Sequence, residues 1–498
     1  MPPVAFAASP PVAPRTASAI AWSLAFGLTV GITLARSVIP IIWTHQFNAD
    51  EAIFGLMATH LVDGRAFPLF MYGSPYMLGA EAWAAAPFFA IAGPSVAALK
   101  LPLLVANIAI AWLLFRILHK DAGLTPAAAL VASLPFTIAA PFVSIGTYME
   151  VSGGNVEPCL YVLLLWMLRH RPWWFGLVLG LGFAHRQFTA YGAAALLCLQ
   201  AMDRSLLRKA TLERWLIVAL AVALVWEAIA LLRVWSSPMG PGTSWTADDR
   251  AAFDAAAGFA CVAPSTFAGG MRAFVVEGLP LMLGLETQPR LAAALAIALV
   301  LGFVRIVWVS TLMRGAQPVL AQSAPSAYIA LVGLFSVTGY VALRCGTVNP
   351  ATLRYALLAP FLFVGLASLF FRLEPSRWGR LAAALVVVAW AIVPAAQHAA
   401  LVRGYLREPP VHWRSQLARH LESRGIRHAI GDYWDAYVVT FLSREQVRVA
   451  SDTHVRITEY QDEFDRQPGA RWRISRRPCP AGGYEAVPGA FWMCPISP

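Results

Sequence analysis

The feature that most constrains this sequence is a series of about eleven long apolar segments separated by short connections. A helix needs about 20 mostly apolar residues to cross a bilayer. Because 58% of the residues are hydrophobic and only 13% are charged, an ordinary soluble globular protein is excluded. We therefore predict a polytopic α-helical membrane protein. The predicted spans are 18–42, 95–118, 126–143, 157–168, 172–184, 188–202, 212–234, 290–312, 326–343, 352–371 and 381–401.

Basic residues fall on alternate connections between these spans, for example in 204–214 and 372–380. The positive-inside rule places such connections in the cytoplasm. The opposite, external side then carries the first loop (43–93), the loop 235–289 and the tail after Arg403. This topology accounts for the net charge of +11, so a nucleic-acid partner is not predicted.

The sequence predicts three regions. Residues 1–17 are rich in Pro and Ala and are predicted to be a disordered cytoplasmic N-terminus. Residues 18–402 form the membrane domain, and its first span is interpreted as an uncleaved anchor. In 403–498 the charge density rises and short helical and strand patterns alternate, which predicts a small external α/β domain. Helices are predicted over 412–424 and 433–443, and strands over 427–431, 445–450, 471–475 and 491–494.

Two cysteines of the tail, Cys479 and Cys494, close a loop that contains Gly and Pro. This favours a disulfide in an oxidising compartment. The aromatic residues Tyr433, Trp434 and Tyr437 recur within one predicted helix of the tail. At this spacing, packing between helix and sheet is favoured over carbohydrate binding.

The first external loop contains two helical patterns that are too short to span a bilayer, over 50–62 and 79–92. They are predicted to lie at the membrane surface. The turn 71–76 between them carries the hydroxyls of Tyr72 and Tyr76. Two adjacent carboxylates open the first helix, and an ionised group beside a bilayer needs water, a partner or a function.

Four motifs of this chain resemble the GT-C glycosyltransferase superfamily. They are D-E-A-x-x-G-x-x-A (50–58), Y-G-S-P-Y (72–76), G-P-S-V-A-A-L-K (93–100) and R-Y-A-L-L-A-P (354–360). The likeness is to bacterial members similar to protein O-mannosyltransferases and to aminoarabinose or galacturonic acid transferases acting on lipid A. It implies a GT-C-like bundle with two surface helices in the first external loop, embedded in the bacterial inner membrane. It also implies inverting transfer of a sugar from a polyprenyl-phosphate donor to a lipid, glycan or protein acceptor on the external side.

By its position in the family motif, Asp50 is the candidate general base. Glycosyl transfer passes through an oxocarbenium-like state, and a carboxylate must activate the attacking hydroxyl. The alternative for Asp50 is a helix cap. Glu51 is the second catalytic candidate; it orients the acceptor, helps to bind a divalent ion or faces water. No cysteine spacing indicates a zinc site. The sequence identifies no definite cofactor and leaves a divalent metal ion open.

The leaving group is a lipid phosphate, so a cation must stabilise its charge. Arg354 and Tyr355 occupy the family's R-Y position, at the external end of a predicted span. Arg344 ends the preceding span on the same side, and His185 and Arg186 lie in a short external turn. For the arginines at span ends the alternative is snorkelling to lipid headgroups, and for the His-Arg pair it is an interfacial anchor.

Further substrate-binding candidates are Glu81, Lys100, Tyr72 and Tyr76. A solvated helix face is the alternative for Glu81, and snorkelling is the alternative for Lys100. The external loop 150–157 contains S-G-G-N between two glutamates, and its glycines permit close backbone approach to a ligand.

Two other functions compete with the enzyme. A transporter or flippase of lipid-linked sugars would place charges in mid-membrane and show paired repeats, whereas the candidate charges here gather at external span ends. A non-catalytic carbohydrate-binding scaffold is disfavoured by the retained Asp50.

Overall fold

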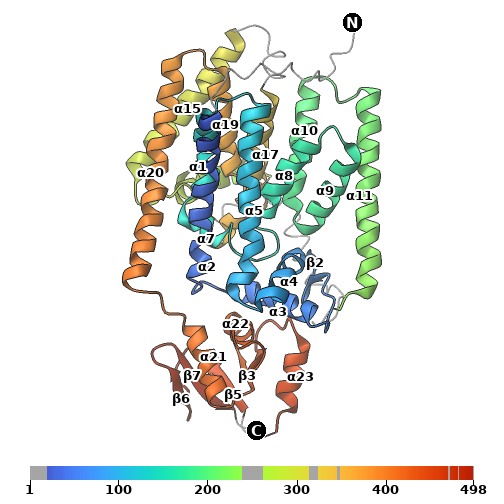
Figure 1. The fold of residues 1–498 in the computed structure, drawn as a ribbon, viewed down its shortest axis with the longest axis vertical. Helices are drawn as coiled ribbons and strands as arrows, with labels where there is room; N and C mark the ends of the chain where they lie inside the picture. Colours follow the sequence, from blue (N-terminus) through green and yellow to red (C-terminus); the bar gives the residue numbers. More distant parts are fainter. Residues whose placement is uncertain are drawn as a thin grey trace.

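The computed structural model describes residues 19–237, 262–312, 323–344, 348–468, 471–480 and 482–496 of the 498-residue chain. Its helices form an elongated bundle, and a small domain lies beyond one end of the bundle (Figure 1). The bundle and its ends contain α1 (Ala19–Ser37), α2 (Ile39–Ile42), α3 (Ala49–Val62), α4 (Ala80–Ala92), α5 (Val96–Arg116), η1 (Ile117–Asp121), α6 (Pro126–Thr137), α7 (Pro141–Gly146), α8 (Glu157–Leu168), α9 (Pro172–His185), η2 (Gln187–Thr189), α10 (Ala190–Met202), α11 (Lys209–Trp235), α13 (Pro264–Ala273), η3 (Phe274–Gly278), α14 (Leu279–Met282), α15 (Pro289–Leu312), α17 (Ala324–Arg344), α18 (Pro350–Leu353), η4 (Arg354–Ala356), α19 (Pro360–Leu373) and α20 (Arg377–Arg407).

Each of the eleven predicted spans contains helix, but eleven crossings are not confirmed. Among the described residues, 7 helical segments are long and apolar enough to cross a membrane. They are Ala19–Ile42, Val96–Asp121, Lys209–Trp235, Pro289–Thr311, Ala324–Leu343, Arg354–Leu373 and Arg377–Arg407. The helices α6, α8, α9 and α10 have only 12, 12, 14 and 13 residues. Their apolar sequence predicted helix correctly, but their length is short of a full crossing.

Glycines bring α17 and α19 into backbone contact. A Cβ at Gly333 would lie 2.0 Å from the Leu362 nitrogen, and one at Gly365 would lie 2.3 Å from the Ala330 nitrogen. Small residues at such crossings allow membrane helices to pack closely without a side chain between them.

The two predicted helices of the first external loop are α3 and α4, and both lie at the end of the bundle nearest the small domain (Figure 1). The predicted turn between them is a hairpin of β1 (Phe70–Met71) and β2 (Ser74–Leu78). Most residues of α3 are buried. The helix lies in a hydrophobic core to which both the bundle and the small domain contribute side chains. The helix is therefore covered on both sides.

The small domain is a mixed five-stranded sheet with three helices, which confirms the predicted C-terminal α/β domain. Its strand order is β4-β3-β5-β7-β6; β3 is parallel to β4 and β5, and β7 is antiparallel to β5 and β6. Two of its elements, α23 and β6, were not predicted. The helix α23 buries only two apolar side chains, so its sequence gives a weak signal. The elements are α21 (Trp413–Ser423), β3 (His428–Gly431), α22 (Tyr433–Leu442), β4 (Arg448–Ser451), α23 (Thr458–Arg466), β5 (Arg471–Ser475), β6 (Tyr484–Val487) and β7 (Phe491–Ile496).

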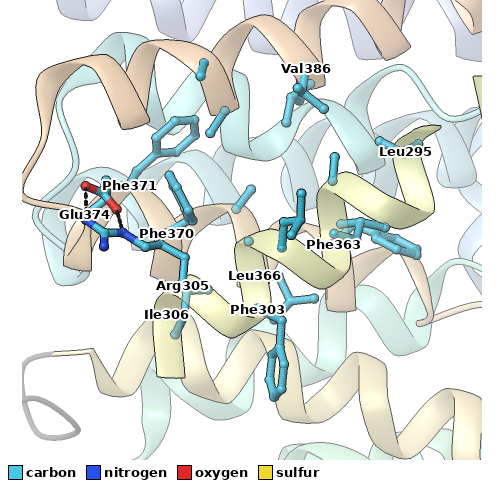
Figure 2. A pocket seen from close by; sticks show the side chains of 18 of the residues that line it. Leu295, Phe303, Arg305, Ile306, Phe363, Leu366, Phe370, Phe371, Glu374 and Val386 are labelled. Carbon is cyan, nitrogen blue, oxygen red and sulfur yellow. Dashed lines mark hydrogen bonds and ion pairs between the residues drawn. The ribbon is translucent and has the colours of Figure 1, made fainter. Parts of the chain in front are cut away.

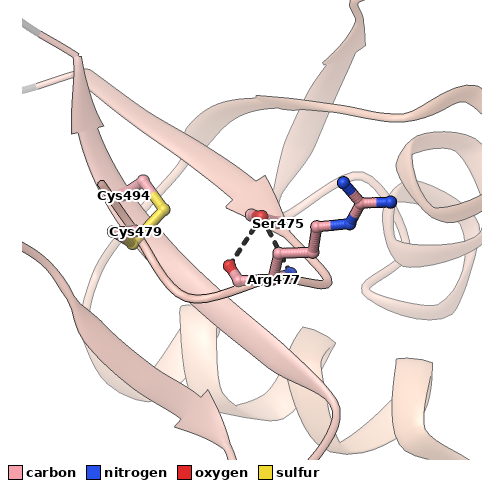
Figure 3. The surroundings of a disulfide bond; sticks show 4 residues. All are labelled: Ser475, Arg477, Cys479 and Cys494. Atoms are coloured by element: carbon pink, nitrogen blue, oxygen red, sulfur yellow. Dashed lines mark hydrogen bonds between the residues drawn. A yellow bond between two sulfur atoms is a disulfide. The ribbon is translucent and has the colours of Figure 1, made fainter.

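The predicted disulfide between Cys479 and Cys494 is present and joins the loop after β5 to β7 (Figure 3). The same loop begins with a tight turn, in which Ser475 Oγ donates to the Arg477 carbonyl (2.8 Å) and the Arg477 N–H donates back to Ser475 Oγ (3.0 Å). The disulfide therefore ties an irregular segment to the sheet.

Candidate active site

The N-terminus of α3 is capped by Asn48. Its side chain accepts a hydrogen bond from the Glu51 N–H (3.1 Å), and the Glu51 carboxylate accepts one from the Asn48 N–H (3.4 Å). This reciprocal pair is a capping box. The alternative of a capping role for Asp50 is thus wrong, because its neighbours satisfy the helix end.

Asp50 is half-buried. Its Oδ1 accepts a hydrogen bond of 2.5 Å from the phenol of Tyr433, the first residue of α22. Within the part of the chain that the structure describes, this is the only hydrogen bond of the Asp50 side chain. Asp50 also interacts electrostatically with Arg354. Its carboxylate therefore contacts the C-terminal domain directly and is within electrostatic range of a cation of the bundle.

Glu51 has a different environment from its neighbour. Its side chain is 2% exposed, so it does not face water, and it forms a buried ion pair with Lys100. The Lys100 ammonium also donates to the Met149 carbonyl (2.7 Å), and the Val151 N–H donates to Glu51 Oε1 (3.1 Å). A small cavity of about 50 Å³ borders this pair. Glu51, which is next to Asp50 in the sequence, is thus held in a buried ion pair with Lys100.

Glu150 is a third carboxylate at this site. It accepts hydrogen bonds from Asn48 Nδ2 (2.7 Å) and Asn155 Nδ2 (3.3 Å). Burial, together with the negative charge of Glu51, raises the pKa of Glu150 from 4.5 to about 7. Near neutral pH this carboxyl is therefore divided between its protonated and charged forms.

Two guanidinium groups flank the ring of Tyr355. The Cζ atoms of Arg354 and Arg186 lie 5.4 Å and 5.8 Å from its centroid. The buried Nε of Arg354 has no hydrogen-bond partner among the described residues. The predicted phosphate-binding residues Arg354, Tyr355 and Arg186 are therefore brought together. Arg344 ends α17, but its side chain lies outside the described residues.

His185 and Glu81 belong to a buried network beside these arginines. The His185 Nε2 lies 3.3 Å from Glu81 Oε2, and its Nδ1 is hydrogen-bonded to the Tyr161 hydroxyl (2.9 Å). The Gly154 N–H donates to Glu81 Oε1 (2.6 Å). Gly154 has φ +86°, and a Cβ there would lie 3.2 Å from both His185 Nε2 and Arg186 Cβ. The glycine-rich turn is needed for this close approach.

Of the two tyrosines of the hairpin, Tyr72 is buried and hydrogen-bonded. Tyr72 is 1% exposed, and its hydroxyl is hydrogen-bonded to His60 Nδ1 (3.0 Å). His60 Nε2 in turn contacts Glu445 of the C-terminal domain (3.2 Å). Tyr72 thus lies in a buried network between loop and domain. The side chain of Tyr76 lies outside the described residues.

Sequence reasoning missed one residue of the site and underrated another. Tyr433 was assigned to packing, yet its hydroxyl contacts Asp50. Glu150 was noted only as a neighbour of the glycine-rich turn. No sequence pattern links Tyr433 to Asp50, because they lie in different domains. Among the described residues, no group of three or more His, Cys, Asp or Glu side chains is arranged to hold a metal ion.

A larger cavity, of about 460 Å³, lies away from these residues (Figure 2). Its walls are almost entirely apolar side chains of α6, α15, α19 and α20. At one end, Arg305 Nε donates to Glu374 Oε2 (2.8 Å). Neither Asp50 nor Arg354 lines this cavity. It is therefore separate from the candidate active site.

No family model and no curated protein sequence matches this chain. Solved structures do match, and two of them are of ArnT from Cupriavidus metallidurans. The structure bound to undecaprenyl phosphate aligns with a TM-score of 0.57 and 9% identity, over 96% of this chain and 98% of ArnT. The apo structure aligns with a TM-score of 0.54 and 9% identity, over 95% and 98%. The chain therefore has the predicted multi-span GT-C fold, shared with ArnT over nearly its whole length.

Proposed function

We propose that this protein is a membrane glycosyltransferase. It moves a sugar from a polyprenyl-phosphate donor to a lipid, glycan or protein acceptor on the external face of a bacterial inner membrane. One observation carries the proposal: an ArnT-like bundle presents a half-buried carboxylate, Asp50, together with a pair of arginines, Arg354 and Arg186, that lie against one tyrosine ring. A carboxylate base and a cation for the leaving phosphate are the two charges that an inverting glycosyl transfer requires.

In the proposed reaction, the hydroxyl oxygen of the acceptor attacks the anomeric carbon of the sugar, and Asp50 accepts the proton of that hydroxyl. The bond from that carbon to the donor phosphate breaks on the opposite face, so the configuration inverts. The half-buried position of Asp50 suits this role, because it is open to an acceptor while its neighbour Glu51 is neutralised by Lys100.

The departing phosphate is proposed to bind between Arg354 and Arg186. Both guanidinium groups lie against the ring of Tyr355, so the two cations are near each other. Two such cations match the charge of a phosphate monoester. The ArnT structure bound to undecaprenyl phosphate supports a lipid phosphate as the ligand of this fold.

The test uses purified protein in lipid vesicles with radiolabelled sugars on undecaprenyl phosphate, and envelope lipids, glycans and peptides as acceptors. Wild type is expected to transfer label, whereas Asp50→Asn loses at least about 100-fold in rate. Asp63→Asn is the matched control, since it changes an exposed carboxylate at the other end of α3 and is expected to retain full activity. Full activity of Asp50→Asn would refute the assignment of the base.

Two further measurements separate the competing functions. Arg354→Gln is expected to weaken binding of undecaprenyl phosphate, measured with the lipid alone. If the lipid-linked sugar crosses the vesicle membrane without being consumed, the protein is a transporter. If the sugar is bound but neither consumed nor moved, the protein is a binding scaffold.

A further inference from the structure

The hydrogen bond between Asp50 and Tyr433 joins the candidate base to a different domain. Tyr433 Oη donates to Asp50 Oδ1 at 2.5 Å, and the second carboxylate oxygen makes no hydrogen bond within the described part of the chain. The tyrosine is 5% exposed, so water has little access to this contact. The base therefore has one oxygen held and one oxygen available.

Tyr433 is itself fixed by its place in the fold. Asp432 caps α22 by accepting a hydrogen bond from the Trp434 N–H (2.9 Å), and Tyr433 is the first residue inside the helix. The Tyr433 ring meets Tyr437 edge-on at 5.4 Å and His454 at 5.8 Å. The phenol is thus presented by a rigid helix end and not by a loop.

The domain that carries Tyr433 is fastened to α3 and the hairpin. The ring of Phe441 fills the space above Gly55, where a Cβ would lie 2.5 Å from it. Arg65 donates to Glu445 Oε2 (2.8 Å), and Arg456 donates to the Gly73 carbonyl (2.7 Å). Contacts on α3, on the segment that follows α3 and on the hairpin turn therefore fix the domain against the first external loop.

We propose that Tyr433 is a positioning residue for Asp50, so that the C-terminal domain completes the active site. By holding Oδ1, the phenol directs Oδ2 toward the incoming acceptor hydroxyl. This inference rests on the proposed function. In the reaction, the acceptor proton moves to Asp50 Oδ2, the bond from acceptor oxygen to sugar forms, and the polyprenyl phosphate leaves.

The proton chemistry of Tyr433 agrees with a fixed donor. Burial and the negative charge of Asp50 raise the pKa of the Tyr433 phenol above its ordinary value. The phenol therefore keeps its proton throughout the neutral range. It orients the carboxylate and does not exchange protons with the substrate.

The experiment compares Tyr433→Phe with Tyr437→Phe. Tyr437 is a matched control in the same helix: its buried hydroxyl accepts hydrogen bonds from the Arg456 and Ile457 N–H groups and does not touch Asp50. Sugar transfer is measured with the donor and acceptor fraction that wild type uses. Tyr433→Phe is expected to lower kcat about tenfold with the donor KM unchanged. Tyr437→Phe is expected to keep kcat within about twofold, even where its melting temperature falls further.

Three results would overturn the inference, and they are distinguishable. Equal losses of kcat in both variants would assign Tyr433 a structural role alone. A higher kcat in Tyr433→Phe would mean that the phenol competes with the acceptor for Asp50. If wild type transfers sugar and Tyr433→Phe is unaffected, only this inference fails; if wild type transfers none from any donor, the proposed function fails with it.

Discussion

The buried ion pair of Glu51 and Lys100 gives the strongest quantitative prediction. The two side chains are 2% and 5% exposed, and each is held by further groups, with Lys100 bound to the Met149 carbonyl and Glu51 to the Val151 N–H. Removing one partner of such a pair leaves a buried charge without compensation, which costs about 3–5 kcal/mol. Lys100→Met has nearly the same length, so the loss of charge dominates the change.

The magnitude follows from what remains around Glu51. In Lys100→Met the carboxylate keeps two backbone N–H donors, from Asn48 and Val151. Neutral donors do not replace a cation, so we expect a loss near 3 kcal/mol, at the lower end of that range. In Glu51→Gln the ammonium keeps the Met149 carbonyl, and a similar loss is expected. The double variant has no buried charge and is expected to lose less than the sum of the single variants, by at least about 2 kcal/mol.

The assay is thermal unfolding of the detergent-solubilised protein, for wild type, both single variants and the double variant. Undecaprenyl phosphate binding is measured on each variant in parallel. Additive losses, or a loss below about 1 kcal/mol in Lys100→Met, would refute the ion-pair reasoning. A stable Lys100→Met variant with weakened lipid binding would restore the predicted role of Lys100 in substrate binding.

Three other predictions concern single positions. Because the folded-state pKa of Glu150, about 7, lies above its ordinary 4.5, wild type is expected to lose roughly 1–3 kcal/mol of stability between pH 5 and pH 8. Glu150→Gln should remove this loss in melting curves, and an unchanged pH dependence in the variant would contradict the assignment to Glu150. Gly365→Ala places a Cβ 2.3 Å from the Ala330 nitrogen and is expected to lower the free energy of unfolding by at least about 1–3 kcal/mol. The control Gly302→Ala has only one ring carbon nearby, at 3.8 Å, and should leave stability unchanged. Equal melting temperatures of the two variants would refute the packing argument. Hydrogen bonds from His60 and Arg65 hold the pKa of Glu445 below its usual range, so the contribution of Glu445 to stability is present above about pH 4.5 and is lost as the pH falls further. Glu445→Gln should lower stability by about 1.5–3 kcal/mol at pH 7 and speed hydrogen exchange in the C-terminal domain. Unchanged exchange would argue against a role of Glu445 in holding the domains together.

Hydropathy predicted the position of helix in the membrane domain, because apolar runs are a local property of the sequence. Length was harder: the segments 157–168 and 172–184 form helices that are too short for a full crossing. The motif around Asp50 predicted the position of α3 and supplied the proposed base. The buried state of Glu51 was not foreseen, since its partner Lys100 lies in the next helix and only packing brings them together.

The aromatic residues of α22 show why the rest of the site was missed. Their helical spacing predicted one apolar face against a sheet, and Val439 does lie in the core of the C-terminal domain. Tyr433, Tyr437 and Phe441 lie instead in the core shared with the membrane domain. A helix with two buried faces needs two partners. The sequence of the helix records that both faces are apolar, but not which partner covers each face.

The capping box explains how adjacent carboxylates come to have opposite environments. Successive residues of an α-helix point about 100° apart, so Asp50 and Glu51 cannot face the same way. The Asn48 N–H donates a hydrogen bond that holds the Glu51 carboxylate at the helix end, where Lys100 forms an ion pair with it. This fixes the rotation of α3 and leaves Asp50 directed at Tyr433. Asn48 also donates to Glu150, so one cap residue orients α3 and contacts the loop on the other side of the site. The position of the proposed base is thus set by the residue two places before it.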